Sequence, residues 1–222
     1  MNLYEVMRTA GTTRRFLPDP VPDTILFRVL ENARFAPNGG NRQGWRVIIV
    51  TDGPTRRALH DLYQPPWHAY LAERYGIIPG TANQPDLPEA LLRSMYFANR
   101  LHEVPVHMVV TVDLGSLAVT DRDLPRQSIV GGGSVYPFVQ NLLLGLRAEG
   151  VGAALTTMIV PAEAEVKELL GIPHEQALAA LIAVGFPADP LPTKLRRKSV
   201  EEFAVRDRFD GPPFEAPAKE ER

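Results

Sequence analysis

The sequence predicts an α+β fold, in which helices surround a central sheet. Three largely apolar runs of strand length, at 45–51, 106–112 and 177–184, supply the sheet. A helix predicted over 134–149 is apolar around most of its circumference, which places it in the core. Helices and strands do not alternate regularly, so a doubly wound parallel sheet is not predicted.

The first strong helical pattern covers 24–36, with Asp23 as its predicted cap and a stop at 37–40. The strand at 45–51 follows, and a short helix is predicted around 56–63. The order of these elements is therefore helix, strand, helix.

Residues 64–104 are mixed in pattern and are interpreted as a variable helical lid region. Pro65-Pro66 interrupts the helical pattern, and Pro79-Gly80 predicts a turn. A further helix is predicted over 87–101.

The strand at 106–112 is buried by composition, and a polar, glycine-rich connection at 115–133 follows it. The helix at 134–149 comes next, with Ser134 as its predicted N-cap and Gly150 as its stop. It is the longest helix of the prediction.

The last ordered elements are a short strand at 153–159, a helix at 162–170 and the strand at 177–184. An extended tail punctuated by proline occupies 187–222. We interpret 1–222 as a single domain with no internal repeat.

Composition excludes several classes of function. The chain of 222 residues carries a formal net charge of −2, which gives no overall field for nucleic acid or an anionic membrane. No cysteine is present, which excludes disulfides and thiolate chemistry. No stretch has the length of a membrane helix or the apolar core of a signal peptide, so a cytoplasmic protein is expected.

Common catalytic signatures are missing from the sequence. It contains no G-x-S-x-G, H-E-x-x-H or P-loop motif, and Gly150-Val151-Gly152 lacks the third glycine of a dinucleotide fingerprint. The five histidines show no metal-ligand pairing, so no metal site is predicted.

Four separated segments carry the functional prediction: 12–16 (Thr-Thr-Arg-Arg-Phe), 36–45 (Ala-Pro-Asn-Gly-Gly-Asn-Arg-Gln-Gly-Trp), 155–157 (Leu-Thr-Thr) and 195–202 (Leu-Arg-Arg-Lys-Ser-Val-Glu-Glu). In this order and spacing they resemble the nitroreductase-like family of FMN-dependent oxidoreductases. The segment at 36–45 is the most specific of the four.

The resemblance implies an antiparallel-dominated sheet surrounded by helices and an intertwined homodimer with FMN at the subunit interface. It also implies transfer of reducing equivalents from NAD(P)H to a small electron-poor acceptor, nitroaromatic or quinone-like, by a ping-pong mechanism. Reductive dehalogenation or another specialised flavin reaction remains an alternative on the same fold. The lid region would decide between them.

The resemblance also assigns residues to the cofactor. Arg14 corresponds to a basic residue at the pyrimidine edge of the flavin, the strand with Thr156 and Thr157 faces N5 and O4, and Arg197 corresponds to a phosphate-binding arginine. The predicted cofactor-binding residues are Thr12, Arg14, Pro37, Asn38, Gly39, Asn41, Gln43, Leu155, Thr156, Thr157, Arg196 and Arg197.

No side chain is expected to act as a nucleophile or general base, because hydride transfer depends on stacking geometry. Arg14 is expected to act as an electrostatic stabiliser, since reduction of a flavin places negative charge at N1 and O2. A surface pair between Arg14 and a carboxylate such as Asp19 is the alternative for this residue.

The sequence departs from the family pattern at Ala10-Gly11, where the family commonly has two arginines. Arg8 or Arg196 is the candidate to compensate. The departure motivates another alternative, a flavin-binding protein without turnover that sequesters or senses flavin. The basic cluster at 194–198 would suggest nucleic-acid binding, but no basic stripe accompanies it.

Overall fold

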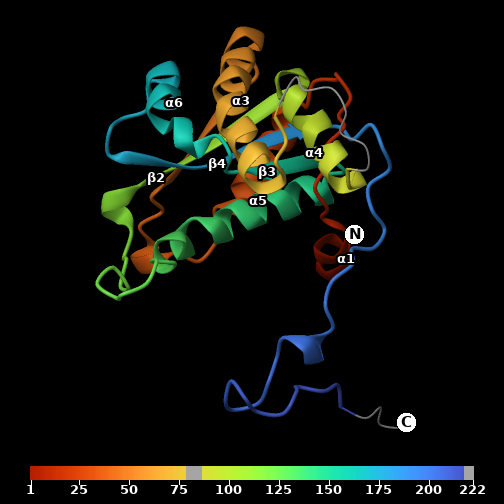
Figure 1. The fold of residues 1–222 in the computed structure, drawn as a ribbon, viewed down its shortest axis with the longest axis vertical. Coiled ribbons are helices and arrows are strands. Elements are labelled where there is room, and N and C mark those ends of the chain that lie inside the picture. Colours follow the sequence, from red (N-terminus) through yellow and green to blue (C-terminus); the bar gives the residue numbers. More distant parts are fainter. Residues whose placement is uncertain (79–86, 218–222) are drawn as a thin grey trace.

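A four-stranded antiparallel sheet forms the centre of the protein, whose computed structural model describes residues 1–78 and 87–217. The strands lie in the order β1-β2-β4-β3, and each neighbouring pair is antiparallel (Figure 1). Their bounds are Trp45–Val50 for β1, Val106–Asp113 for β2, Gly152–Thr156 for β3 and Gln176–Gly185 for β4. The predicted α+β fold with an antiparallel sheet is confirmed.

Both faces of the sheet are buried, which explains why its strands read as continuous apolar runs. In β2, Met108 and Val110 belong to one hydrophobic cluster and Val109 to the other. Successive side chains of a strand point to opposite faces, so β2 contributes to two cores.

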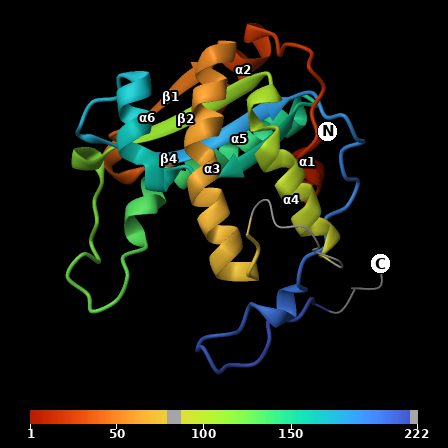
Figure 2. The same cartoon turned by 45° about the horizontal axis from the view of Figure 1, so that its top comes forward.

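Helices cover both faces of this sheet (Figure 2). Residues of α2 and α5 pack into one cluster, and residues of α3, α4 and α6 pack into the other. A short helix, α1, contacts α5. The bounds are Leu3–Thr9 for α1, Asp23–Ala33 for α2, Gly53–Tyr75 for α3, Glu89–Asn99 for α4, Tyr136–Ala148 for α5 and Glu163–Leu170 for α6.

The two predicted N-caps are wrong. Pro22 precedes α2 as its cap residue, so Asp23 is the first residue of the helix rather than its cap. Val135 occupies the cap position of α5, and the Ser134 hydroxyl instead accepts a hydrogen bond from the backbone N–H of Gly39 at 3.0 Å. The serine thus connects α5 to the loop after α2.

The prediction of a short helix at 56–63 is also wrong, because α3 continues through Pro65 and Pro66 to Tyr75 and is longer than α5. Each proline removes one helical hydrogen bond. The helix is stabilised instead by packing of buried side chains four residues apart, which lie on one face: Leu59, Tyr63, Trp67 and Leu71.

Other boundaries differ by a few residues. α1 was not predicted; it has a capping box in which Asn2 and Glu5 exchange hydrogen bonds. β3 ends at Thr156 rather than at 159, because the chain turns there into a 3₁₀ helix at Val160–Ala162. The predicted helix at 87–101 is confirmed as α4, whereas the Pro79-Gly80 turn lies outside the described residues.

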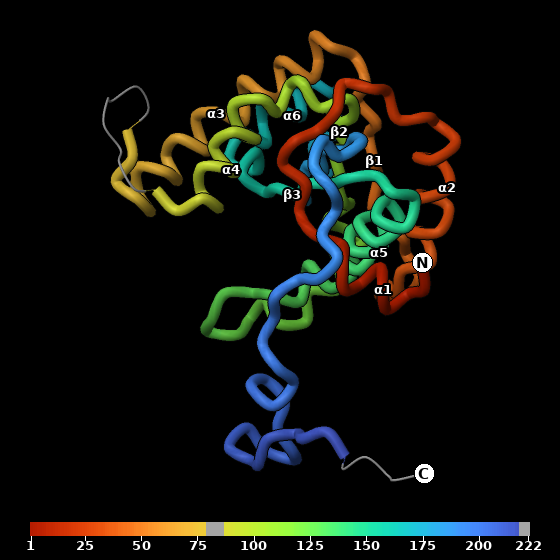
Figure 3. The backbone as a smooth tube through the Cα atoms, turned by 90° about the vertical axis from the view of Figure 1, so that its right-hand side faces the viewer, coloured from red at the N-terminus to blue at the C-terminus, as the bar shows by residue number. Residues whose placement is uncertain are grey.

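The segment at 12–17 lies between β3 and the start of the tail (Figure 3). Thr13 donates its N–H to the Ala153 carbonyl at 2.9 Å, and Leu17 donates to the Phe186 carbonyl at 2.8 Å. The tail then continues as an extended chain whose one described helical turn is Val200–Glu202, and its end lies away from the sheet.

The buried side chain of His107 on β2 should make stability fall in mild acid. Burial, as the largest cause, and the nearby Arg56, His102 and His60 side chains together lower the pKa of His107 to about 4, against the opposing effect of its hydrogen bond with the Leu101 carbonyl. The unfolded histidine titrates near 6.5, so above that pH the histidine is neutral in both states and can be buried without losing a proton. This stability is lost as pH falls toward 4, by about 3 kcal/mol.

Urea denaturation between pH 7 and pH 4 measures this loss. His107→Leu should flatten the pH dependence, whereas the control His174→Gln, at an exposed position, should keep it. An unchanged pH slope in His107→Leu would assign the effect to other groups.

Candidate active site

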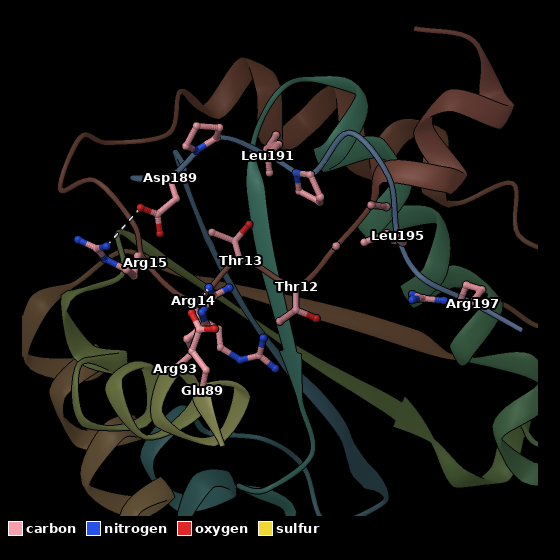
Figure 4. A pocket seen from close by; sticks show the side chains of 14 residues that line it. Thr12, Thr13, Arg14, Arg15, Glu89, Arg93, Asp189, Leu191, Leu195 and Arg197 are labelled. Carbon is pink, nitrogen blue, oxygen red and sulfur yellow. Dashed lines mark hydrogen bonds and ion pairs between the residues drawn. The ribbon is translucent and has the colours of Figure 1, made fainter. Parts of the chain in front are cut away.

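A cavity of about 730 Å³ opens between the segment at 10–15, the start of the tail and α4 (Figure 4). Its lining includes four arginines and two carboxylates: Arg14, Arg15, Arg93, Arg197, Glu89 and Asp189. The sequence segments around Arg14 and Arg197 are therefore brought to one cavity, although about 180 residues separate them along the chain.

Close backbone contact between the segment at 12–14 and β3 positions Arg14. Thr12 forms an isolated parallel bridge with Ala153. A Cβ atom on Gly152 would lie 2.6 Å from the Thr13 hydroxyl, so only glycine allows this approach. Sequence analysis rejected Gly150-Val151-Gly152 as a dinucleotide fingerprint. Its Gly152 instead allows close packing beside the cavity.

The charges in this cavity divide into paired and unpaired groups. Arg15 pairs with Asp189 at 3.2 Å, and Arg93 pairs with Glu89 on the next turn of α4. Among the described residues no carboxylate pairs with Arg14 or Arg197, and the Arg197 guanidinium donates a hydrogen bond to the Arg196 carbonyl. The cavity therefore presents two uncompensated guanidinium groups.

Arg14 is half-buried, and its surroundings disfavour its charge. Burial lowers the pKa of Arg14, the nearby Arg93 cation lowers it further, and Tyr63 opposes the change. Figure 4 shows Arg14 beside Arg93 and Glu89, with Arg197 apart from them across Thr12. The alternative of a surface pair with Asp19 is not found, since the described salt bridges contain no such contact. A half-buried, unpaired cation suits an anionic or electron-rich ligand.

A smaller cavity of about 200 Å³ adjoins the first and shares Thr12 and Arg14 with it. α3 supplies one wall with three aromatic rings in succession: the centroids of Tyr63 and Trp67 are 6.3 Å apart, and those of Trp67 and Tyr70 are 5.7 Å apart. Sequence analysis missed these residues. The apolar spacing of four from Leu59 to Leu71 was the signal that could have found them.

Thr156 meets Tyr63 at the boundary of this smaller cavity. The Thr156 hydroxyl accepts the N–H of Met158 at 3.1 Å, and Thr156 and Tyr63 both line this cavity. Tyr63 is only 3% exposed, and burial raises its pKa despite the opposing effects of Thr156 and Arg14. Tyr63 therefore stays protonated at neutral pH.

The predicted site residues fall into two groups. Five of them line these adjoining cavities: Thr12, Arg14, Leu155, Thr156 and Arg197. The lining includes neither Arg196 nor Thr157, both of which are exposed, and it includes none of the residues predicted from the loop after α2.

That loop, 37–43, is a structured and largely exposed surface. The Asn38 side chain accepts the Gln43 N–H at 2.9 Å and donates to the Ala36 carbonyl at 3.3 Å, so it fixes the loop. Asn41 and Gln43 adopt positive φ angles of 53° and 50°. This conformation is uncommon for residues other than glycine and is found at functional sites.

The structure explains what replaces the family's arginine at Gly11. A Cβ there would lie 2.8 Å from Pro192 and 3.1 Å from Leu195, so the tail fills the space of a side chain. Neither Arg8 nor Arg196, the candidates for compensation, is among the residues that line the larger cavity. In the described part of the chain, Arg197 is the cation at this end of the cavity.

Residues 1–78 and 87–217 hold no group of three histidine, aspartate or glutamate side chains arranged to bind a metal. Within the same ranges, no helix is both long and apolar enough to cross a membrane.

Comparison with known proteins identifies the family, since residues 8–186 match the Nitroreductase family. The chain belongs to the nitroreductase family. It is 28% identical over 190 residues to an NADH dehydrogenase of Thermus thermophilus, covering 79% of this chain and 82% of the relative. It is 25% identical over 201 residues to an iodotyrosine deiodinase of Thermotoga neapolitana, covering 90% and 97%.

A solved structure of oxidized iodotyrosine deiodinase bound to FMN and 3-iodo-L-tyrosine is also similar. Its TM-score is 0.69 at 25% identity, and the match covers 92% of this chain and all of the other.

Proposed function

We propose that the protein is an FMN-dependent oxidoreductase that passes reducing equivalents from NAD(P)H to a small electron-poor aromatic acceptor. The observation that carries the proposal is the pair of uncompensated guanidinium groups, Arg14 and Arg197, in one cavity beside β3. FMN needs cations of this kind in two places, at the ring edge and at the phosphate.

The residues present fit FMN. Arg197 would hold the phosphate, for which a guanidinium is the best protein partner because it can donate two parallel hydrogen bonds. Arg14 would lie at the pyrimidine edge of the ring, and β3 would supply backbone donors from Leu155 and Thr156. The chemistry that a bound FMN supplies is acceptance of a hydride and its transfer to an acceptor.

We further propose a homodimer in which the loop at 37–43 of one protomer completes the cavity of its partner. In a single chain this loop is exposed and does not line the cavity that holds Arg14. The family resemblance assigns both regions to the same cofactor, and a second copy reconciles that assignment with their separation.

The smaller cavity suits the acceptor. Its volume of about 200 Å³ is below the usual range for drug-sized ligands, and its wall of Tyr63, Trp67 and Tyr70 favours a flat ring. The relative named as an NADH dehydrogenase supports a nicotinamide donor. The lid role of 64–104 is supported by the position of α3 and α4 around this cavity.

The test is an absorbance spectrum of the purified protein, followed by assays with NADH and NADPH. The protein should bind FMN, with flavin absorbance, and should release FMN rather than FAD on denaturation. Steady oxidation of NAD(P)H should require a nitroaromatic or quinone acceptor. A protein that neither carries flavin nor quenches FMN fluorescence at micromolar concentration would contradict the proposal.

Dehalogenation is the second candidate, favoured by the similarity to the deiodinases. Release of iodide from 3-iodotyrosine by the reduced protein, exceeding its activity on nitroaromatics, would select it. FMN binding without oxidation of NAD(P)H by any acceptor would select a flavin-sequestering or sensory role.

Replacement of Arg14 by glutamine should lower the two-electron potential of bound FMN while the flavin still binds. The substitution removes a charge that is not neutralised by any described carboxylate. If the guanidinium stabilises the reduced state by about 1.4 kcal/mol more than the oxidised state, the potential falls by about 30 mV. Reduction by NAD(P)H should slow accordingly.

A redox titration of the holoprotein measures this shift. The control is Arg15→Gln, because Arg15 lies next in the chain but is paired with Asp189. A normal potential and normal FMN affinity in Arg14→Gln would remove Arg14 from the flavin site.

A further inference from the structure

A further cavity, of about 570 Å³, lies where β1 ends, β2 begins and α3 starts. It shares no lining residue with the two cavities beside β3. Its volume is in the range of small-molecule sites. Its polar lining includes Thr51, Arg56, Arg57 and His102, and the proposed function assigns no role to any of them.

Arg56 is held in a fixed position at this cavity. Its Nη1 atom donates to the carbonyl oxygens of His102 and Val104, at 2.9 Å and 2.7 Å. Its Nε atom is buried and has no acceptor among the described residues, and no described carboxylate forms a salt bridge with this guanidinium. A buried donor without an acceptor is costly. The fold therefore orients this cation without neutralising it.

Arg57 adds a second cation at the next position of α3. Arg57 is exposed, and within residues 1–78 and 87–217 neither a salt bridge nor a side-chain hydrogen bond engages it. Thr51, directly after β1, adds a hydroxyl group that likewise has no hydrogen-bond partner in these ranges. Two guanidinium groups and a hydroxyl donor thus converge on one cavity.

The carboxylates beside these arginines are engaged elsewhere. Asp52 accepts hydrogen bonds from the N–H and the hydroxyl of Thr55, at 2.8 Å and 2.6 Å. Glu103 also lines the cavity, but one of its oxygens pairs with Arg100 at 2.9 Å and the other lies 3.8 Å from His102. The two arginines are therefore available to an external anion.

The rest of the lining is apolar and comes from the segments 18–21 and 105–106, which contribute three prolines and two valines. Asp19, within the first segment, is exposed and is not part of the lining. A concave apolar surface with a few convergent polar groups is typical of a site for an organic molecule. Two unpaired guanidinium groups match the two negative charges of a phosphate monoester, whereas a monocarboxylate would leave one of them uncompensated.

We propose that this cavity binds a phosphate monoester. The phosphate accepts hydrogen bonds from Arg56, Arg57 and Thr51, and the organic part of the ligand packs against 18–21 and 105–106. This site needs neither the flavin nor the cavities beside β3, so the inference goes beyond the proposed function.

The first measurement is a calorimetric titration of the purified protein with phenyl phosphate at constant ionic strength. Arg57→Gln should weaken binding by at least about tenfold, and the charge reversal Arg57→Glu should abolish it. Because Arg57 is exposed and makes no described hydrogen bond, both variants should fold normally. Absence of binding to wild type at millimolar concentration would overturn the inference, and so would unchanged affinity in Arg57→Gln.

Arg74→Gln is the matched control. Arg74 is an exposed cation in the last turn of the same helix and does not line the cavity. Its loss should leave the affinity for phenyl phosphate unchanged. A loss as large as that in Arg57→Gln would mean that the anion responds only to the overall charge of the protein, which contradicts a local site.

A second set of titrations separates this site from the proposed FMN site. Arg197 is the other candidate to bind a phosphate, so the titrations are repeated in Arg197→Ala. Arg57→Gln should weaken binding equally in both backgrounds. Binding that depends on Arg197 and not on Arg57 would place the ligand beside β3 and overturn the inference. Binding that depends on Arg57 in a protein without FMN affinity would support the inference and contradict the proposed function.

Inorganic phosphate and phenol test the two parts of the ligand. Inorganic phosphate should bind more weakly than phenyl phosphate, because it lacks the group that packs against the apolar lining, and its binding should still depend on Arg57. Equal affinity for both would overturn the assignment of an organic monoester. Phenol that displaces phenyl phosphate at equal concentration would overturn the role of the phosphate group.

Discussion

Ending the chain at Lys198 should convert the protein from a dimer to a monomer and weaken FMN binding by at least about tenfold, which corresponds to about 1.4 kcal/mol. The deleted tail exposes apolar side chains that the single chain leaves uncovered. Phe203 is 68% exposed, Phe209 is fully exposed and Phe214 is 45% exposed. Clustered aromatic side chains of this exposure indicate a protein partner.

FMN affinity should fall with the dimer if, as proposed, the loop at 37–43 reaches the flavin from the partner protomer. The truncated chain retains Arg14 and Arg197, so the lining that one chain contributes to the cavity keeps both cations. Sedimentation at micromolar concentration and FMN fluorescence titration measure the two effects.

Arg208→Ser is the control for the truncation, since it breaks the exposed pair with Asp210 in the same tail without removing an apolar group. It should remain a dimer. A truncated protein that stays dimeric with full FMN affinity would show that the tail does not hold the partner.

The sheet could be predicted from sequence because its strands are buried on both faces. Apolar runs such as 106–112 and 177–184 are then unambiguous in length and composition. α3 was truncated in the prediction because Pro65-Pro66 is a strong local signal for a break. Tertiary packing of Leu59, Tyr63 and Trp67 outweighs that local cost, and local sequence patterns do not report such packing.

The site, like the fold, could be predicted from the sequence only in part. Arg14 and Arg197 were predicted from the order of four sequence segments, and the structure places both in one cavity. Tyr63 could not be found in this way, because only the fold brings it to the same cavity as Thr156, across 93 positions of sequence. The loop at 37–43 was predicted together with the others, but its separation in one chain follows from its place after α2.

The fit of the tail against Gly11 could not be predicted either. Sequence analysis found the absence of the family's arginine pair at this position but looked to Arg8 and Arg196 for a replacement. Pro192 and Leu195 occupy the space above Gly11. An apolar contact thus stands where the family pattern has charge, and the proposed phosphate end of the cavity would depend on fewer cations.

Arg197→Ala should therefore weaken FMN binding by about 1.5–3 kcal/mol, the range for a hydrogen bond to a charged group, or roughly 10- to 150-fold in Kd. Arg197 lines the cavity, and no described carboxylate competes for it. The other arginines of the lining cannot substitute for it at low cost: Arg15 pairs with Asp189, and Arg93 pairs with Glu89. The effect on binding should come from the phosphate alone.

Two comparisons isolate that effect. Arg196→Ala removes the same side chain from the neighbouring residue, which is exposed and outside the lining, and should change the FMN Kd by less than about threefold. Riboflavin, which lacks the phosphate, should bind wild type and Arg197→Ala equally. Once the site of Arg197→Ala is saturated with FMN, NAD(P)H should reduce the flavin at the wild-type rate, because Arg197 lies apart from Arg14, the residue proposed for the ring edge. Equal FMN affinity in wild type and Arg197→Ala would mean that other residues bind the phosphate. A parallel loss of riboflavin affinity would mean that Arg197 supports the fold of the cavity and does not bind the phosphate.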